Sequence, residues 1–449
     1  MKTYEELEAY MEEENVKFIR LAFFDAMGIQ KNVAIMPSEL RRAMKEGISF
    51  DATSIAGYGT NEKSDLFLKP ELSTLTAVPW RPVDGRVVRI FCEVQNPDGT
   101  PFALSPRNYL KKAAQAAREM GLHVNVGPEM EFYAFKLDPN GHRTYEPQDH
   151  AGYMDTDPFD QGSNLRREVC YTLVDMGITP EASHHESGPG QNEVDFHYSN
   201  PLSAADNTAT VKWAIRSVAD SMGLWADFSP KPLRDEPGSG MHLNFSLQSG
   251  DGKDYLPQFM AGVMKYIRDM TLFLNPTQKS YLRFGEMEAP KYVSWSPQNR
   301  SQLIRIPASE SPRMELRSPD AMCNPYLAYA LVIYAGLEGI RQGLRPDAPM
   351  NTNLYTADAD FTRRLQQLPM NVSEAVRCAQ RSAFIRQYVP QEYIDLYCSD
   401  EKREKYADFY EEYQQPSDRC FFAEYHEFHQ TGHGRPFREG CRCRYHGSG

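Results

Sequence analysis

The chain has 449 residues and carries 61 acidic against 49 basic side chains, which gives a net charge of −12. This balance argues against general binding to nucleic acid or to an anionic membrane, because both need a basic surface. The mean hydropathy is −0.59, and the longest apolar run, near residues 327–337, is too short to span a bilayer.

The N-terminal segment is acidic and amphipathic and lacks the apolar stretch of a secretory signal. Thr3-x-x-Glu6 forms a capping box and predicts a helix that runs to about residue 14. Strands are expected at 18–25, 75–78 and 86–94, with a short helix at 38–46. This first block predicts a small α+β domain that ends near residue 102.

Ser105-Pro106 predicts the start of a helix that ends at Gly121, and a strand follows at about 124–135. Further helices are expected at 164–176, 207–222 and 256–274, then from Asn324-Pro325 and again from about 372. Short strands are expected near 182–187, 192–197, 225–229 and 241–247. The pattern indicates antiparallel strands with helices packed outside, an α+β arrangement.

The positions of the cysteines indicate a reducing compartment. Cys92, Cys170, Cys323 and Cys378 stand singly in apolar or helical surroundings, which is typical of reduced core thiols. Together with the missing secretory signal, they lead us to expect a cytoplasmic location.

Glu129 and Glu131 lie two residues apart in the strand expected at 124–135. Strand side chains alternate between faces, so both carboxylates point the same way. Two like charges repel, and burying them unpaired is costly. Either they are solvated on an edge strand, the common case for charged residues, or a positive group lies beside them.

Two further polar segments point to the same chemistry. The turn Gly188-Pro-Gly190 predicts a hairpin that brings Glu186 near Glu193, and the hairpin is either solvated or part of a site. In 241–247, apolar residues take one face while His242, Asn244 and Ser246 take the other. Joined to four carboxylates, His242 becomes a candidate metal ligand.

Arginines supply the positive charge. Arg313, Glu315 and Arg317 share one face of an alternating segment, and Arg300 and Arg305 precede them. Guanidinium groups around a carboxylate suit a site for carboxylate or phosphate anions. The alternative is a surface ladder of weak ion pairs.

Carboxylates without thiolates select hard divalent cations, Mg²⁺ or Mn²⁺. Arginines beside such ions are typical of phosphoryl transfer. The chain contains no Gly-x-x-x-x-Gly-Lys-Ser/Thr sequence, so it is not a P-loop enzyme. The residues by themselves therefore indicate a two-metal enzyme that uses a nucleotide.

These segments resemble type I glutamine synthetase (glutamate–ammonia ligase), and the matches follow the family order from residue 15 to about 410. The matching motifs are Gly127-Pro-Glu-Met-Glu-Phe132, His184-His-Glu186, Gly190-Gln-Asn-Glu-Val194, Gly238-Ser-Gly-Met-His242, Asn299-Arg-Ser301, Arg313-Met-Glu-Leu-Arg317, Phe50-Asp-Ala-Thr-Ser54 and Asn324-Pro-Tyr326.

The resemblance implies an α+β fold with a small N-terminal β-grasp domain at 1–102 and a large catalytic domain at 103–449, an antiparallel sheet with outer helices. It implies ATP-dependent ligation of ammonia to the γ-carboxylate of L-glutamate through γ-glutamyl phosphate, with two or more Mg²⁺ or Mn²⁺ ions per site. It also implies a dodecamer of two stacked hexameric rings, with each site between neighbouring subunits.

Position by position, the resemblance assigns Glu131, Glu186 and Glu193 to one metal, and Glu129, His242 and Glu315 to the second. It assigns Arg283, Arg300, Arg317 and Gly238 to glutamate or the transferring phosphate, Ser246, Arg305 and Arg313 to the nucleotide, and Asp51, Ser54 and Tyr153 to the ammonium site. Asp51 would take a proton from ammonium, and Glu288 on a mobile loop would close over the site.

Some positions depart from the family pattern. Pro237 replaces an asparagine that helps to hold the amino acid, the segment that carries Glu288 is one residue short, and the usual ending is not recognisable after about residue 413. Relatives that join glutamate to polyamines or other amines vary at these places, so a γ-glutamyl-amine ligase is the alternative. A catalytically inactive homologue is disfavoured because all six candidate metal ligands are present.

Two features near the C-terminus add hypotheses. The tail carries His426, His429, His433, Cys441 and Cys443, but their spacing fits no zinc motif, and we expect a mobile terminus. Asn353-Leu-Tyr355 resembles a tyrosine loop that is adenylylated in one branch of the family; an ordinary loop tyrosine is the alternative.

Overall fold

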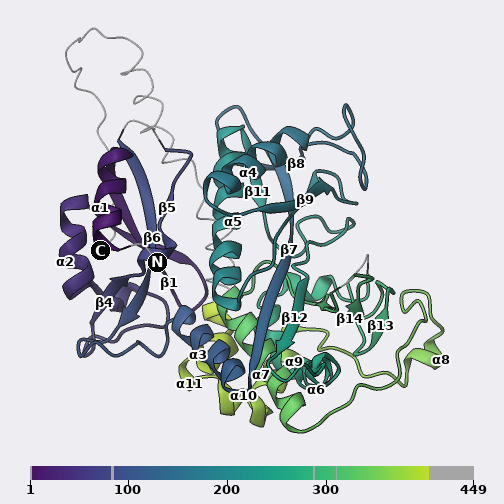
Figure 1. The fold of residues 1–449 in the computed structure, drawn as a ribbon. Helices are drawn as coiled ribbons and strands as arrows, with labels where there is room; N and C mark the ends of the chain where they lie inside the picture. Colours follow the sequence, from purple (N-terminus) through teal and green to yellow (C-terminus); the bar gives the residue numbers. More distant parts are fainter. Residues whose placement is uncertain (1–2, 82–84, 287–288, 310, 404–449) are drawn as a thin grey trace, which may run out of the picture.

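The computed structural model describes residues 3–81, 85–286, 289–309 and 311–403. Glu288 and the histidines and cysteines of the tail lie outside these residues. Figure 1 shows a small N-terminal unit on one side and a larger unit on the other, with the long strand β7 running through the larger one.

The N-terminal unit is a sheet of six strands in the order β2-β1-β6-β4-β3, with β5 beside β6. Its elements are α1 (Tyr4–Glu13), β1 (Val16–Phe24), β2 (Gln30–Ile35), η1 (Pro37–Glu39), α2 (Leu40–Glu46), β3 (Ile48–Asp51), η2 (Ala52–Ser54), β4 (Asp65–Pro70), η3 (Leu72–Thr74), β5 (Thr76–Ala77) and β6 (Arg86–Gln95). Thr3 caps α1 through the predicted capping box. The apolar faces of α1 and α2 pack on this sheet.

The larger unit is built on a nine-stranded sheet in the order β13-β14-β15-β12-β7-β10-β9, with β8 and β11 also beside β7. Its strands are β7 (Leu122–Leu137), β8 (Arg143–Pro147), β9 (Pro180–His185), β10 (Gln191–Phe196), β11 (Leu224–Asp227), β12 (Leu243–Ser249), β13 (Trp295–Pro297), β14 (Ile304–Ile306) and β15 (Met314–Leu316). Its helices are α3 (Pro106–Glu119), α4 (Ser163–Asp175), α5 (Pro201–Ser221), α6 (Leu256–Leu274), η4 (Lys279–Leu282), α7 (Pro325–Arg341), α8 (Ala359–Thr362), α9 (Val372–Arg381), α10 (Ala383–Tyr388) and α11 (Gln391–Cys398).

The apolar run near residues 327–337 forms the buried helix α7, as predicted. It meets α6 almost backbone to backbone, because a Cβ atom on Gly262 would lie 2.1 Å from the carbonyl oxygen of Ala335. Larger residues there would force the two helices apart. No helix among the described residues is both long enough and apolar enough to cross a membrane.

The α+β class is confirmed, but several details differ from the sequence-based expectation. The helix expected from residue 207 begins at Pro201, where the side chain of Asn200 accepts a hydrogen bond from the Ser203 amide. The sheet of the larger unit is not wholly antiparallel, since β13 and β14 run parallel. Strands as short as these carry too few residues for an alternating pattern to show.

The two units are joined by a buried ion-pair network around Arg107 of α3. Its guanidinium group makes two hydrogen bonds to the Asp206 carboxylate, at 2.9 and 2.7 Å, and pairs with Glu71 of the N-terminal unit. The Tyr326 hydroxyl donates to the same Asp206 carboxylate at 2.7 Å. Arg107 is 2% exposed, so removing it would take the guanidinium partner from the buried Asp206 carboxylate, while Glu71 keeps its ion pair with Lys111.

We predict that Arg107→Met destabilises the protein by about 3–5 kcal/mol, the usual cost of breaking a buried ion pair from one side. Chemical denaturation followed by circular dichroism measures the change. Arg118→Met on the same helix is the matched control, because the exposed Arg118 side chain hydrogen-bonds to exposed Gln115 on the surface of α3. We expect a change within about 0.5 kcal/mol. Equal losses for both variants would contradict the role given to Arg107.

Candidate functional site

The site lies where β7 changes partners. Its first half pairs with β12 as far as Pro128, opposite Leu243, and its second half pairs with β10 from Glu129, opposite Asp195. The pairing of β7 therefore passes from β12 to β10 at one place in the middle of the strand, and Glu129 and Glu131 lie at that point. As predicted, alternation places both carboxylates on the same face, and the imidazole of His242 lies beside them.

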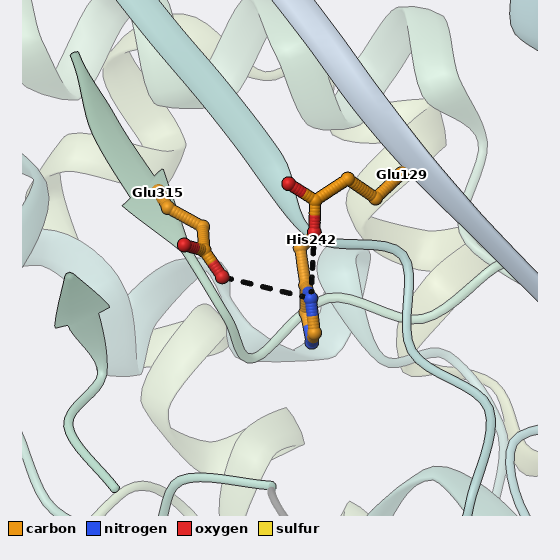
Figure 2. Close-up of side chains that lie close together, drawn as sticks. All are labelled: Glu129, His242 and Glu315. Carbon is orange, nitrogen blue, oxygen red and sulfur yellow. Dashed lines mark hydrogen bonds and ion pairs between the residues drawn. The ribbon is translucent and has the colours of Figure 1, made fainter. Parts of the chain in front are cut away.

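Glu129, His242 and Glu315 form the first cluster. Figure 2 shows the three side chains converging from β7, from the residue before β12, and from β15. The Nδ1 atom of His242 lies 3.1 Å from a Glu129 oxygen and 3.7 Å from a Glu315 oxygen. One ligand atom from each residue lies within 4.8 Å of the others, so one divalent ion could contact all three.

The arginines approach the same cluster. Arg305 and Arg317 both pair with the fully buried Glu315, one on each carboxylate oxygen. Arg313 donates through Nε to the Asn244 side chain at 3.0 Å, and Asn244 donates to Glu129 at 2.8 Å. The alternative of a surface charge ladder is wrong for Arg317 and Glu315, which are 0% exposed.

The hairpin of β9 and β10 forms the second cluster, as its turn predicted. His184 lies 3.6 Å from a Glu186 oxygen and 3.9 Å from a Glu193 oxygen, and one ligand atom from each of the three lies within 4.8 Å of the others. The sequence analysis did not single out His184, although alternation with Glu186 places both side chains on one face. Glu131 lies between the clusters, 3.8 Å from the Nε2 atom of His242.

The two clusters differ in electrostatics. Burial opposes ionisation of Glu129, but the hydrogen bond and charge of His242 outweigh it and lower the pKa of that carboxyl to about 2. Burial and then the charge of Asp195 raise the pKa of Glu193 well above its usual value. Burial and then Glu129 raise the pKa of Asp195 to about 7. The hairpin side thus has more negative charge than its surroundings neutralise.

Both clusters fit hard divalent cations. Their donors are carboxylates and imidazoles without a thiolate, and the excess negative charge on the hairpin side is what a bound cation would neutralise. Mg²⁺ or Mn²⁺ is therefore compatible with Glu129, His242 and Glu315, and with Glu131, Glu186, Glu193 and His184.

A third group of acidic and imidazole side chains, Asp149, Asp160 and His185, is a structural network. His185 is fully buried, and its ring nitrogens lie 2.8 Å from Asp149 and 2.6 Å from the Glu186 carbonyl oxygen. Asp160 pairs with the Arg166 guanidinium. These contacts hold the β9–β10 hairpin in place. These contacts could not be predicted from the sequence, because Asp149 and Asp160 lie in a loop without a periodic pattern.

A cavity of about 250 Å³ adjoins the clusters. Glu131, Glu186, Pro237, Gly238 and Arg283 are among the residues that line it. The Arg283 side chain is 3% exposed, and its Nε atom has no hydrogen-bond partner within the described part of the chain. A buried donor of this kind suits the carboxylate of a small ligand.

The other predicted residues belong to neither cluster. Asp51 and Ser54 are exposed in the N-terminal unit, and Asp51 lines a separate cavity of about 620 Å³ against α5. Tyr153 is exposed, with its ring 5.3 Å from that of His184. Ser246 follows Asn244 on the polar face of β12. Arg300 is exposed, and its carbonyl oxygen accepts from Arg317 and from Tyr355. Adenylylation of Tyr355 stays a prediction.

Comparisons with known proteins agree with this arrangement. The family models for the glutamine synthetase β-grasp domain and catalytic domain match residues 15–97 and 103–420. Glutamine synthetase of Methanosarcina mazei is 43% identical over 413 residues, which are 88% of this chain and 92% of the relative. That of Clostridium saccharobutylicum is 43% identical over 392 residues, 83% of this chain and 88% of the relative.

Two solved structures are also similar. The GmaS/ADP complex superposes with a TM-score of 0.80 at 26% identity and covers 93% of this chain and 99% of its own. Glutamine synthetase of Plasmodium falciparum gives a TM-score of 0.78 at 23% identity, covering 95% and 99%, and shows the shared fold.

The raised pKa values lead to a prediction for the metal-free protein. A carboxyl whose pKa is higher in the folded state stabilises the fold below its unfolded pKa and loses that contribution as the pH rises. We expect the melting temperature to fall between about pH 4.5 and pH 7, and Glu193→Gln to reduce this fall and to melt higher than the wild type near pH 7.5.

Adding Mn²⁺ near pH 7.5 should raise the melting temperature of the wild type more than that of Glu193→Gln, because only the wild type keeps every carboxylate for the ion. Differential scanning fluorimetry with chelator as the blank measures both effects. A Glu193→Gln protein that melts lower than the wild type without metal, with the same pH slope, would contradict the charge excess.

Proposed function

Because this chain belongs to the glutamine synthetase family, whose members are ligases, we propose that it joins ammonia to the γ-carboxylate of L-glutamate with the hydrolysis of ATP. The observation that carries the proposal is the pair of carboxylate clusters at the partner change of β7, next to a cavity lined by Arg283. The location proposed for this activity is the cytoplasm.

In this proposal the arginines bind the anions. Arg305 and Arg313 contact the nucleotide phosphates, while Arg283, Arg300 and Arg317 hold glutamate and the transferring phosphoryl group, because rigid guanidinium groups match carboxylate and phosphate oxygens. Ser246 adds a nucleotide contact from β12. The relative GmaS, solved with ADP, supports nucleotide binding in this fold.

Divalent ions at the two clusters would supply positive charge where the phosphates and the attacking carboxylate meet. Glu129, His242 and Glu315 would hold one ion, and Glu131, Glu186 and Glu193 another. Phosphoryl transfer to glutamate makes γ-glutamyl phosphate, an acyl group that an amine can attack. Glu288, proposed to close over the site, would keep water from it.

The ammonium site is proposed to combine Asp51, Ser54 and Tyr153 with Glu186. The hydrogen bonds from Thr53 hold the pKa of Asp51 below its usual value, so this carboxylate is ionised and attracts a cation. Asp51 is not among the residues that line the cavity beside Arg283. This supports a site completed by Asp51 of a neighbouring subunit, as in the proposed dodecamer.

A γ-glutamyl-amine ligase is the second candidate. Pro237 offers no side-chain hydrogen bond to an amino acid, and its carbonyl oxygen is already bonded by the Tyr133 hydroxyl at 2.6 Å. The similarity to GmaS at 26% and 27% identity is a further reason to keep this candidate.

An acceptor panel tests the two candidates. Purified protein receives glutamate, ATP and Mn²⁺ with ammonium, methylamine or a polyamine, and phosphate release and the amide product are measured. We expect the highest kcat/KM with ammonium. A much higher kcat/KM with another amine would overturn glutamine synthesis in favour of the second candidate, and no turnover with any amine would overturn both.

We predict that Glu131→Gln lowers kcat/KM by roughly 100-fold or more, since loss of even an outer partner of a metal site costs about 10–100-fold. The fold should persist, because an amide fills the same volume and removes a charge from a crowded site. Steady-state kinetics with Mn²⁺ and a melting curve check the two parts. Near-normal turnover in a folded variant would refute the assignment of Glu131 as a metal ligand.

A further inference from the structure

Gln191 begins β10 and has no role in the mechanism proposed so far. Its side chain is 1% exposed and lies opposite Tyr133 of β7, two pairs beyond the Glu193–Glu131 pair. Alternation therefore places Gln191 on the same face of the sheet as Glu131 and Glu193.

Three hydrogen bonds use both ends of the Gln191 amide. Oε1 accepts from the Gly188 amide at 2.9 Å, while Nε2 donates to Glu131 Oε2 at 3.4 Å and to the Gly238 carbonyl oxygen at 3.2 Å. The orientation of the amide is determined by its partners, because a backbone N–H can only donate, and a carboxylate and a carbonyl can only accept.

The same turn is held from other sides. The Gly240 amide donates to Glu131 Oε2 at 2.8 Å, and the Tyr133 hydroxyl donates to the Pro237 carbonyl. A Cβ atom on Gly238 would lie 2.6 Å from Arg283 Cγ and from the Pro230 carbonyl oxygen, so the backbone packs as closely as a glycine allows. Residues 237–240 therefore depend on side chains of β7 and β10 for their position.

We propose that Gln191 is a positioning residue that ties Glu131 Oε2 to the Gly238 carbonyl, and so sets the distance between the cation side and the amino-acid side of the site. With Oε2 engaged by Gln191 and Gly240, Oε1 of Glu131 is the oxygen that faces His242, at 3.8 Å from its Nε2 atom. The inference rests on the proposed function for the roles of Glu131 and Gly238.

Gln191→Glu tests the inference with little change of shape. The new carboxylate still accepts from Gly188 but cannot donate, and it sets a second negative charge beside Glu131. The added charge by itself would strengthen cation binding, so weaker binding reports the lost positioning of Glu131: we expect the dissociation constant for Mn²⁺ to rise about 10–100-fold and KM for glutamate to rise more than kcat falls. Electron paramagnetic resonance or calorimetry measures metal binding without turnover.

Asn192→Asp is the matched control, since it makes the same chemical change one residue along. Asn192 is fully buried, faces the other side of β10, and bonds to Gly190 and Arg166 rather than to Glu131. Its variant should melt lower while its dissociation constant for Mn²⁺ stays within about 2-fold of the wild type, because outer-partner effects depend on contact with a ligand. Equal losses of Mn²⁺ affinity in both variants would show general loosening of the hairpin and overturn the inference.

A double-mutant cycle in the metal-free protein provides an independent test. Gln191→Glu should melt lower than the wild type, and adding Glu131→Gln should recover part of that loss, because the new amide at 131 can donate to the carboxylate at 191. Strictly additive melting shifts would overturn the inference. Neither the cycle nor Mn²⁺ binding requires an amine acceptor, so failure of the proposed ligase activity and failure of this inference give separate results.

Discussion

Like-charge repulsion is the constraint on which the site depends. Five glutamates from four strands or strand ends meet in a poorly solvated volume, and two carboxylates about 4 Å apart repel by ~4 kcal/mol at an effective dielectric of about 20. In the first cluster, side chains of the protein offset the carboxylate charges. His242 and Asn244 bind Glu129, and Arg305 and Arg317 bind Glu315. On the hairpin side neutralisation is incomplete, which is why a divalent cation fits there.

The backbone concentrates these charges through the partner change of β7. A strand that kept one neighbour along its whole length would place its carboxylates against that neighbour's side chains. Here β12 begins at Leu243, opposite Pro128, and β10 pairs with β7 from Asp195, so the loop at 237–242 that leads into β12 lies beside the carboxylates. That arrangement lets the Gly240 amide contact Glu131 directly.

The N-terminal unit carries Asp51 of the proposed site, and it is attached firmly to the larger unit. Arg107 and Asp206 anchor the unit in the larger core by buried ion pairs, so Asp51 is carried on a fixed platform rather than on a flexible arm. Asp51 is not among the residues that line the cavity beside Arg283, which fits the proposal that the site is shared between subunits.

The sequence by itself determined which carboxylates come together: alternation placed Glu129 with Glu131, and the turn at 188–190 placed Glu186 near Glu193. The order of strands and helices predicted the α+β class. Helix α6 was predicted at its observed bounds, because its run of apolar, helix-forming residues is a local signal. Only the tertiary structure decided the partners, such as Gln191 with Gly238, or His185 with Asp149, since these residues are tens of positions apart and no pattern links them. For Glu129 and Glu131, the strand pattern predicted that both carboxylates share one face. Their burial, and therefore the need for a cation, depends on the strands that pack beside β7.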